Sequence, residues 1–394
     1  MKRVAALWLL AGCSQILGVG DPELAGGGDA SHNDGLPFDG LGKLDTGGPG
    51  GCATQPSFGS ATNYGVTAGP VAFDVGDLDH DGLTDVVVVG MASSLVIMHG
   101  TGGGNLGRQQ FVPLPAMSAT GAFSVRAIDL DHDGFVDLVF VATGTDAALY
   151  AQRQDPTHPG TFLPAVHVAD VGPMFIRFAV GDIDGDGLLD LATPNPAATG
   201  IFTFLQLPAA PGTFSAATQV TLGSTSGFEQ VAALADLDHD GHLDVIGVFD
   251  GTVKYALQKP TGTFGSPISV GGTGVMDVAA GDVDGDGFDD VLVVTNQSTV
   301  FFQNPATPGT FVAGPTAPVL LKFPELADVN GDGRVDLIGN GQFLLQCAPP
   351  NPARTFLMQL LGQAIGYGDL NADGKLDSIT FDPQNATMAV AIQQ

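Results

Sequence analysis

The sequence has few basic side chains and few of the large flat aromatic ones. Its 394 residues contain 13 Lys and Arg against 42 Asp and Glu, which gives a formal net charge of -29. Such an acidic body repels phosphate backbones and anionic lipid, so we expect neither nucleic acid nor a membrane surface as its partner. Trp occurs once, as Trp8, and Tyr four times, so the surfaces that anchor tight interfaces or stack on sugar rings are scarce.

The first apolar run is too short to span a bilayer. It covers residues 4–10 and follows Lys2 and Arg3, a pattern that predicts an export signal over residues 1–12. The signal ends in Leu10-Ala11-Gly12-Cys13, which resembles the bacterial lipobox, where a lipidated cysteine follows the cleavage site. An ordinary secretory signal with a chance cysteine is the alternative.

Lipid on Cys13 would anchor the chain to a membrane through its N-terminus alone. Ser14 after this cysteine resembles lipoproteins sorted to an outer membrane, so the predicted location is the outer membrane or cell surface of a Gram-negative bacterium. Cys52 and Cys347, the two other cysteines, would then lie in an oxidising compartment. They form a disulfide or remain two free thiols, and the sequence leaves both open.

The remaining chain divides into a tether and a repeat region. Residues 13–51 are rich in Gly, Asp and Pro, which predicts a lipid-bearing flexible tether. Within residues 52–394 one unit recurs seven times, at spacings of 52, 53, 54, 46, 46 and 41 residues. This length is typical of propellers, solenoids or arrays.

Each unit contains short apolar runs, such as residues 86–89 and 253–257, that predict strands and not helices. A fourth segment follows a Gly-Thr-Phe signature, as at Gly160-Thr161-Phe162. The last unit ends after three strands, whereas residues from Ser57 onward match a fourth strand with no blade of its own. We therefore predict an all-β, seven-bladed β-propeller of four-stranded antiparallel blades, closed by the N-terminal strand. A disulfide between Cys52 and Cys347 would lock the same seam.

Every unit carries an acidic segment with oxygen-bearing side chains at positions 1, 3, 5 and 9 and Gly at position 6. Three short side chains that converge from a tight turn, with a carboxylate at the end, are a ligand set for one hard cation. The predicted metal ligands are Asp77, Asp79, Asp81 and Asp85; Asp129, Asp131, Asp133 and Asp137; Asp182, Asp184, Asp186 and Asp190; Asp236, Asp238, Asp240 and Asp244; Asp282, Asp284, Asp286 and Asp290; Asp328, Asn330, Asp332 and Asp336; and Asp369, Asn371, Asp373 and Asp377.

Calcium fits these segments better than magnesium, which requires a strict octahedron, or zinc, which prefers nitrogen and sulfur ligands. An EF-hand would need an acidic residue at position 12 and flanking helices, and both are missing. Solvated aspartate turns would explain one segment but not seven. We expect up to seven calcium sites, with less charge where Asn330 and Asn371 replace aspartate. His80, His132 and His239 at position 4 are expected to be solvated turn residues.

These segments resemble those of the FG-GAP or VCBS repeat family, which includes the integrin α-chain propeller. The resemblance covers about residues 52–394 and is carried by the D-x-D-x-D-G-x-x-D loops, the Gly-Thr-Phe signatures and elements such as Ala280-Gly281-Asp282. It implies a propeller with calcium between the first two strands of each blade. Members are adhesins, scaffolds, and parts of polysaccharide-active enzymes, so the resemblance implies function only loosely.

No motif of an activated nucleophile or a phosphate-binding loop is present, so we predict that the chain is not an enzyme. A calcium-stabilised binding, adhesion or scaffold module, monomeric and with a protein ligand favoured over a glycan, is the leading hypothesis. A polysaccharide-binding or polysaccharide-active propeller of the lyase or hydrolase type is the alternative. The partner surface is expected on the face opposite the acidic segments, in residues 195–200, 224–230, 271–277 and 322–325.

Overall fold

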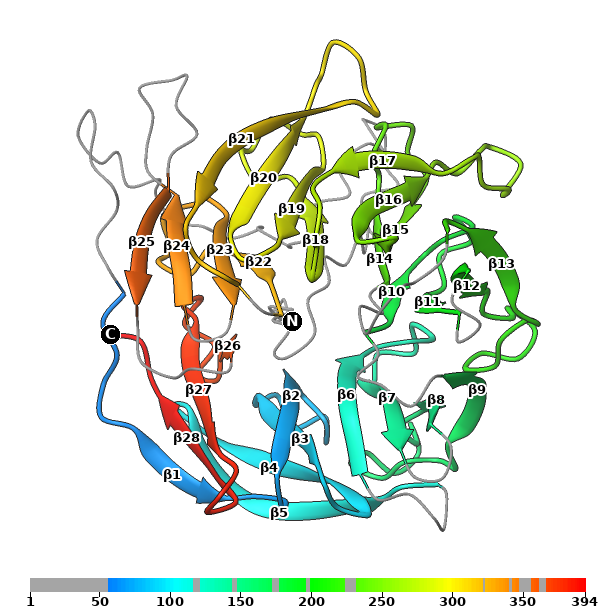
Figure 1. Cartoon of the computed structure of the whole chain (residues 1–394). Coiled ribbons are helices and arrows are strands. Elements are labelled where there is room, and N and C mark those ends of the chain that lie inside the picture. The colour runs from blue at the N-terminus through cyan, green and yellow to red at the C-terminus, as the bar shows by residue number, and fades with distance from the viewer. Residues whose placement is uncertain are drawn as a thin grey trace, which may run out of the picture.

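The computed structural model describes residues 56–115, 121–143, 147–171, 177–195, 199–223, 232–321, 323–339, 342–346, 356–360 and 366–394. These residues form strands and turns, arranged as seven four-stranded sheets that stand like blades around a central axis (Figure 1). A helix long and apolar enough to cross a membrane does not occur among them.

Blades 1 to 4 follow one another along the chain, and each begins with the strand nearest the axis (Figure 1). Blade 1 contains β2 (Pro70–Gly76), β3 (Asp85–Gly90), β4 (Ser94–Gly102) and β5 (Asn105–Pro113). Blade 2 contains β6 (Gly121–Ile128), β7 (Asp137–Thr143), β8 (Ala147–Gln152) and β9 (Val166–Val171). Blade 3 contains β10 (Ala179–Gly181), β11 (Asp190–Pro194), β12 (Gly200–Phe204) and β13 (Thr218–Thr221). Blade 4 contains β14 (Ala232–Ala235), β15 (Asp244–Phe249), β16 (Thr252–Ala256) and β17 (Ile268–Gly271).

Blade 7 takes its strands from both ends of the propeller region. Blade 5 contains β18 (Asp277–Gly281), β19 (Asp290–Val294), β20 (Ser298–Gln303) and β21 (Phe311–Ala317). Blade 6 contains β22 (Glu325–Ala327), β23 (Asp336–Gly339), β24 (Gln342–Gln346) and β25 (Phe356–Leu360). Blade 7 contains β26 (Gly366–Gly368), β27 (Asp377–Asp382), β28 (Thr387–Ala391) and, antiparallel to β28, β1 (Thr62–Gly65). In Figure 1 the blue β1 lies beside the red β28.

Burial decreases from the axis outward. All six residues of β3 are buried, whereas no residue of the outer strand β21 is. An inner strand has a neighbouring blade against each face, so an unbroken apolar run such as that of β3 suits it, whereas an outer strand keeps one edge in water. The short runs of Val and Ala in the sequence therefore mark the strands near the axis.

The hydrophobic core lies between the blades. Leu95 and Ile97 of blade 1 share one buried cluster with Leu138 and Phe140 of blade 2. On the other side of blade 1, Phe73 and Val75 share a cluster with residues of blade 7, and the rings of Phe73 and Phe381 meet edge to face at 5.7 Å. Aromatic pairs in this arrangement stabilise packing beyond their buried area.

A buried ion pair joins blades that are not neighbours. Arg177, just before β10 of blade 3, donates from Nη1 to Asp277 Oδ2 at 2.7 Å and from Nη2 to the Val278 carbonyl at 3.1 Å. Asp277 opens β18 of blade 5 and also accepts the Phe323 N–H at 3.1 Å. Arg177 and Asp277 are 4% and 7% exposed. Segments from blades 3, 5 and 6 thus share one charged contact.

The predicted all-β, seven-bladed propeller of four-stranded antiparallel blades is confirmed, and an N-terminal strand pairs with β28 in the last blade. Within the predicted segment, which begins at Ser57, the regular strand is β1 (Thr62–Gly65). Ahead of it, Phe58 bridges Gln393, the Gly59 N–H donates to the Ile392 carbonyl at 2.8 Å, and the Ser57 carbonyl accepts the Gln394 N–H at 2.8 Å. Segments 1–12 and 13–51, as well as Cys13, Cys52 and Cys347, lie outside the described residues. Lipidation and the disulfide stay predictions.

Candidate metal centres

Each acidic segment connects the first strand of a blade to the second and is called a loop, numbered by its blade. In every blade the first strand ends one residue before position 1, and the position-9 aspartate opens the second strand. The loops are residues 77–85, 129–137, 182–190, 236–244, 282–290, 328–336 and 369–377. All the predicted ligand residues therefore gather at one end of the propeller.

The loop backbone bends around the position-1 carboxylate. In loop 2, Asp129 Oδ1 accepts the Asp133 N–H at 3.1 Å and Oδ2 accepts the Gly134 N–H at 2.9 Å. The turn needs the left-handed region at positions 4 and 6, where φ is 57° at His132 and 90° at Gly134. Glycine adopts this region without the Cβ clash that other residues suffer, which explains the invariant Gly at position 6 of the seven loops.

The position-9 carboxylate is the most deeply buried ligand of each loop, with 0% exposure in all seven. Asp137 shows the shared pattern, because its Oδ2 accepts the Leu130 N–H at 3.1 Å and its Oδ1 accepts the Gln154 N–H at 2.7 Å. Burial raises the pKa of Asp137 to about 8 and that of Asp190 to about 7, and it outweighs the hydrogen bonds from N–H donors, which lower the pKa. Each of these oxygens keeps a second lone pair for a cation.

The raised pKa values predict that the metal-free protein is more stable at pH 5.5 than at pH 8. The folded pKa of these groups, about 6 for Asp377 and about 8 for Asp244, exceeds the unfolded value of about 4. Between the unfolded and the folded pKa values, the folded chain binds more protons than the unfolded chain. The free energy of unfolding therefore falls as the pH rises. Thermal unfolding in a chelator measures this slope. Asp137→Asn should flatten it, whereas Asp155→Asn should not, since hydrogen bonds from Thr157 and His158 lower the pKa of Asp155 to about 2. A slope unaffected by Asp137→Asn would contradict the assignment.

The position-3 aspartates carry oxygens that the described protein leaves without a donor. Oδ1 of Asp79, of Asp131 and of Asp238 is buried and has no hydrogen-bond partner in the described part of the chain. In loops 2, 3 and 4, one oxygen each from positions 1, 3 and 9 lies within 4.8 Å of the others, and in loop 1 positions 1, 3 and 5 do the same. Buried oxygens without donors are costly. The donor set thus fits a hard divalent cation.

The loops differ in the basic groups beside them. The Arg153 guanidinium pairs with Asp131 in loop 2, and Arg334 pairs with Asp332 in loop 6. In loops 6 and 7 the position-3 asparagines use Oδ1 to accept the N–H of position 5, at 3.0 Å for Asn330 and 2.9 Å for Asn371. Among described residues, no Lys, Arg or His pairs with loop 3 or loop 4 carboxylates. We expect these two loops to bind a cation most tightly.

A repeated glutamine, which the sequence analysis missed, fixes six of the seven loops to their surroundings. Gln206 is 1% exposed; its N–H donates to Asp190 Oδ1 at 2.6 Å, and its Nε2 donates at 2.9 Å to Leu189 O and to Leu130 O of the preceding blade's loop. The same backbone donation to position 9 recurs at Gln154, Gln258, Gln303, Gln346 and Gln393. The sequence does contain a signal for this contact, because a Gln follows the third apolar run in six of the seven repeats.

Gln206→Leu is expected to lower the free energy of unfolding by about 3 kcal/mol, because two carbonyls and the Gly212 N–H lose their buried partner,. Urea unfolding in excess calcium measures the loss. The exposed Gln297 is the control, and Gln297→Leu should change stability by less than about 0.5 kcal/mol. Equal effects of the two substitutions would show that Gln206 does not join the blades.

The side chains of two position-4 histidines, His80 and His132, are exposed as expected, whereas His239 is half-buried. The rings of His80 and Phe135 lie 4.4 Å apart, and so do those of His239 and Phe288. Each phenylalanine stands at position 7 of the next blade's loop, so these histidines pack between neighbouring loops rather than pointing only into water. The left-handed φ of 59° at His80 and 58° at His239 directs the side chain away from its own loop.

The fold and the loops define a seven-bladed β-propeller with an acidic loop between the first two strands of each blade. The FG-GAP-like repeat model matches residues 77–140, 236–293 and 282–339, and the FG-GAP repeat model matches residues 176–205. The chain belongs to the FG-GAP repeat family, whose propellers suggest a binding or scaffold module. The search of curated protein sequences gives no match.

Solved structures show the same fold at low sequence identity. Two structures of BBS1N in complex with ARL6DN, soaked with lead and with mercury, are 14% and 13% identical, with TM-scores of 0.51 and 0.52. The match covers 86% of this chain and 97% or 98% of those chains. An Agrocybe aegerita lectin that recognises non-reducing terminal N-acetylglucosamine is 18% identical over 65% of this chain and 81% of its own, with a TM-score of 0.36. The likeness to BBS1N concerns the fold alone.

Proposed function

We propose that this chain is a calcium-stabilised binding module held at the cell surface. The observation that carries the calcium part is the buried Asp238 Oδ1, which has no donor among the described residues and belongs to the group that Asp238 forms with Asp236 and Asp244. Bound calcium would supply the positive charge that these carboxylates lack. The chain's own part is to hold the oxygens in place through N–H donors and the glutamine contacts.

The binding surface lies at the opposite end of the blades from the loops. Antiparallel pairing places the turns between second and third strands, and the connections between blades, at that end. Large apolar side chains are exposed in these segments: Met91 is 62% exposed, Met276 40% and Phe323 44%. Met276 and Phe323 fall within the predicted segments 271–277 and 322–325, whereas residues 196–198, 224–230 and 322 are outside the described residues.

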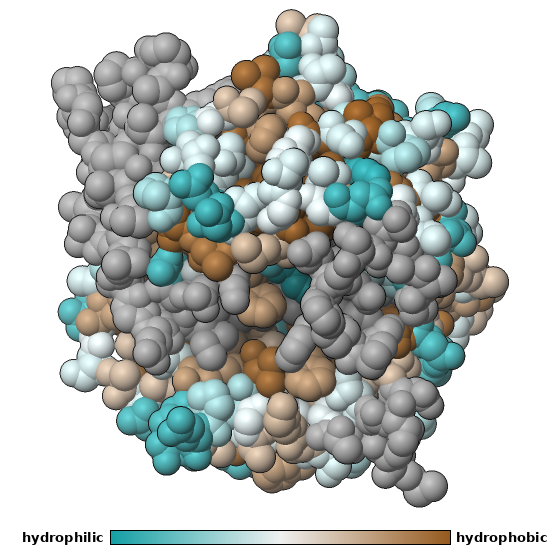
Figure 2. All heavy atoms as spheres, viewed as in Figure 1, coloured by the Kyte–Doolittle hydropathy of each residue, from teal (hydrophilic) through white to brown (hydrophobic). Residues whose placement is uncertain are grey.

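The partner is proposed to be a protein. Exposed methionine and phenylalanine suit an adaptable apolar contact with a protein surface. On the face in Figure 2, hydrophilic side chains form separate clusters with apolar residues exposed between them. A platform on which sugars stack needs flat aromatic rings, and the one Trp of the chain, Trp8, lies in the predicted export signal,.

Capture with the full chain tests the binding function. In calcium, the wild type should retain one protein from envelope or extracellular material, and a chelator should release it. Met276→Glu should weaken this capture, whereas Val312→Glu should not, because Val312 is 61% exposed but lies on the outer strand β21. Capture of polysaccharide would favour the glycan-binding alternative, and no capture in either buffer would overturn the binding function.

The anchor has a separate test. We propose that lipid on Cys13 holds the propeller at an outer membrane through the segment 13–51. The wild type should then partition into the detergent phase, whereas Cys13→Ser should stay in the aqueous phase with the same melting temperature. Equal partitioning of both would reject the lipid anchor without affecting the binding proposal.

A further inference from the structure

Blade 1 differs from the other blades at two adjacent residues beside its loop. In each blade, a backbone N–H near the end of the third strand or just after it donates to the position-9 aspartate. In blade 1 this donor is Gly100, at 2.7 Å from Asp85 Oδ1, and the residue before it is His99. The residues at the same place in blades 2 to 7 are Arg153, Leu205, Leu257, Phe302, Leu345 and Ile392.

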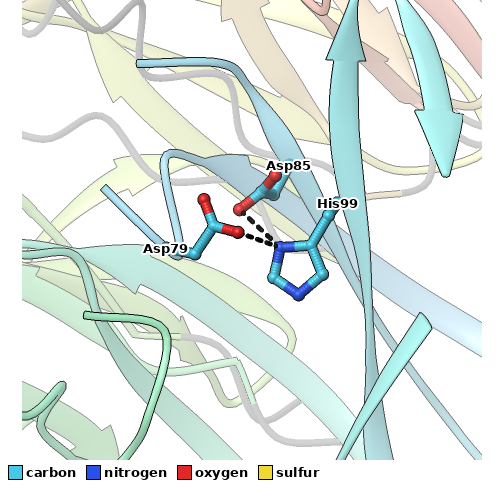
Figure 3. Close-up of side chains that lie close together, drawn as sticks. All are labelled: Asp79, Asp85 and His99. Atoms are coloured by element: carbon cyan, nitrogen blue, oxygen red, sulfur yellow. Dashed lines mark ion pairs between the residues drawn. The ribbon is translucent and has the colours of Figure 1, made fainter. Parts of the chain in front are cut away.

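The His99 ring points at two loop carboxylates (Figure 3). Its Nδ1 lies 2.8 Å from Asp79 Oδ2 and 3.4 Å from Asp85 Oδ2. One ligand atom of each of the three residues lies within 4.8 Å of the others. His99 is 4% exposed and Asp85 0%. Arg108 reaches Asp79 Oδ2 only at 3.7 Å with a side chain that is 63% exposed, so it does not fill the space between the three groups.

A neighbouring amide fixes which nitrogen of His99 carries the proton. Gln110 Nε2 donates to the Gly160 carbonyl at 2.7 Å, so its Oε1 is the atom that faces His99 Nε2 at 3.1 Å. An amide oxygen accepts, and His99 Nε2 therefore donates. In the neutral ring the lone pair is then on Nδ1 and faces the carboxylates.

This arrangement leaves acceptors facing one another. His99 Nδ1 and Asp79 Oδ1 are buried and have no hydrogen-bond partner in the described residues. A cation between them would turn this repulsion into coordination. An imidazole held from its other nitrogen by a hydrogen-bond acceptor is the usual support of a metal-bound histidine.

We propose that blade 1 binds one first-row transition dication, best matched by Zn²⁺, through His99 Nδ1 and one oxygen each of Asp79 and Asp85. Imidazole nitrogen with carboxylate oxygen suits zinc, whereas calcium takes oxygen ligands. Gln110 is a positioning residue that orients the ring. The site shares Asp79 and Asp85 with the predicted calcium ligands of loop 1, so the transition dication would take the place of calcium in blade 1. The calcium proposal then rests on loops 2 to 7, which have no histidine at the equivalent place.

Cobalt titration of the full chain, with its thiols alkylated and excess calcium present, tests this site. The wild type should take up one equivalent of Co²⁺ with visible absorption, and Zn²⁺ should displace it. His99→Leu, which copies the residue in blades 3 and 4, should abolish this uptake while calcium binding by the other blades persists. Gln110→Leu should weaken cobalt binding about 10–100-fold.

His167→Leu is the matched control, because His167 also faces a carboxylate, Asp170 Oδ1 at 2.9 Å, but its side chain is 49% exposed; it should bind cobalt like the wild type. A paramagnetically shifted imidazole resonance in the cobalt-loaded wild type tests the ligand without any substitution. Uptake that survives His99→Leu, displacement of cobalt by calcium, or no shifted imidazole resonance would each overturn the proposal. The last result would leave His99 as an imidazolium paired with the two carboxylates.

Discussion

Transfer of the protein from excess calcium to a chelator is expected to lower the midpoint of thermal unfolding by roughly 15–20 °C. At ten times the dissociation constant, each bound ion stabilises the folded chain by about 1.4 kcal/mol. Seven independent sites would contribute about 10 kcal/mol as an upper figure, which is comparable to the stability of a whole domain. Calorimetry in calcium, in magnesium and in chelator measures the effect, with magnesium expected to restore little of it. A midpoint that does not fall in chelator would contradict the calcium proposal.

Single loops should contribute unequally to this difference. Asp238→Ala removes a position-3 ligand from loop 4, where the described residues place no basic partner. Asp131→Ala removes the equivalent ligand from loop 2, where Arg153 already pairs with it. We expect Asp238→Ala to reduce the calcium-dependent part of the stability by about 1.4 kcal/mol and Asp131→Ala by less. Equal losses would show that Arg153 moves aside when the loop binds calcium.

Arg177→Met is expected to lower the free energy of unfolding by about 3–5 kcal/mol, because it leaves the buried Asp277 carboxylate without its cation. Burial raises the pKa of Asp277 and the Arg177 charge lowers it, so without Arg177 the carboxyl will take up a proton more readily. The loss should therefore be larger at pH 8 than at pH 5. Urea unfolding at both pH values, in excess calcium, measures it.

An exposed ion pair provides the control for this substitution. Lys254 pairs with Asp250, and the two side chains are 19% and 43% exposed. Water solvates the remaining charge, so Lys254→Met should cost less than about 1 kcal/mol. If Arg177→Met cost no more than Lys254→Met, the contact between blades 3, 5 and 6 would not contribute to the stability of the ring.

The features that repeat could be predicted from the sequence. Seven acidic loops, with glycine at position 6 and an apolar run after position 9, indicated both the blade number and the strand order. The last repeat has three predicted strands, which indicated that an N-terminal segment would pair with the third of them, β28, as the fourth strand of blade 7. These predictions succeeded because the turn chemistry at Gly134 or Asp129 is local, involving residues at most a few positions apart.

The features that join distant parts of the chain could not be predicted. His99 reaches loop 1 from the third strand, and only the register of β3 with β4 places it beside Asp79 and Asp85. Arg177 beside blade 3 meets Asp277 of blade 5, which no spacing in the sequence reveals. The exact start of β1 at Thr62 could not be predicted either, because its partner Val390 lies at the other end of the propeller region.

The pairing of Thr62 with Val390 also determines when the molecule can become complete. The ribosome makes β1 before every other strand of the propeller and β28 after them, so β1 has no partner while the other blades are being synthesised. A contact between such distant residues forms slowly, because a long loop must close first. The outer edge of the last blade therefore assembles only when the final strand has emerged. A chain cut short before Thr387 would lack β28, the strand with which β1 pairs.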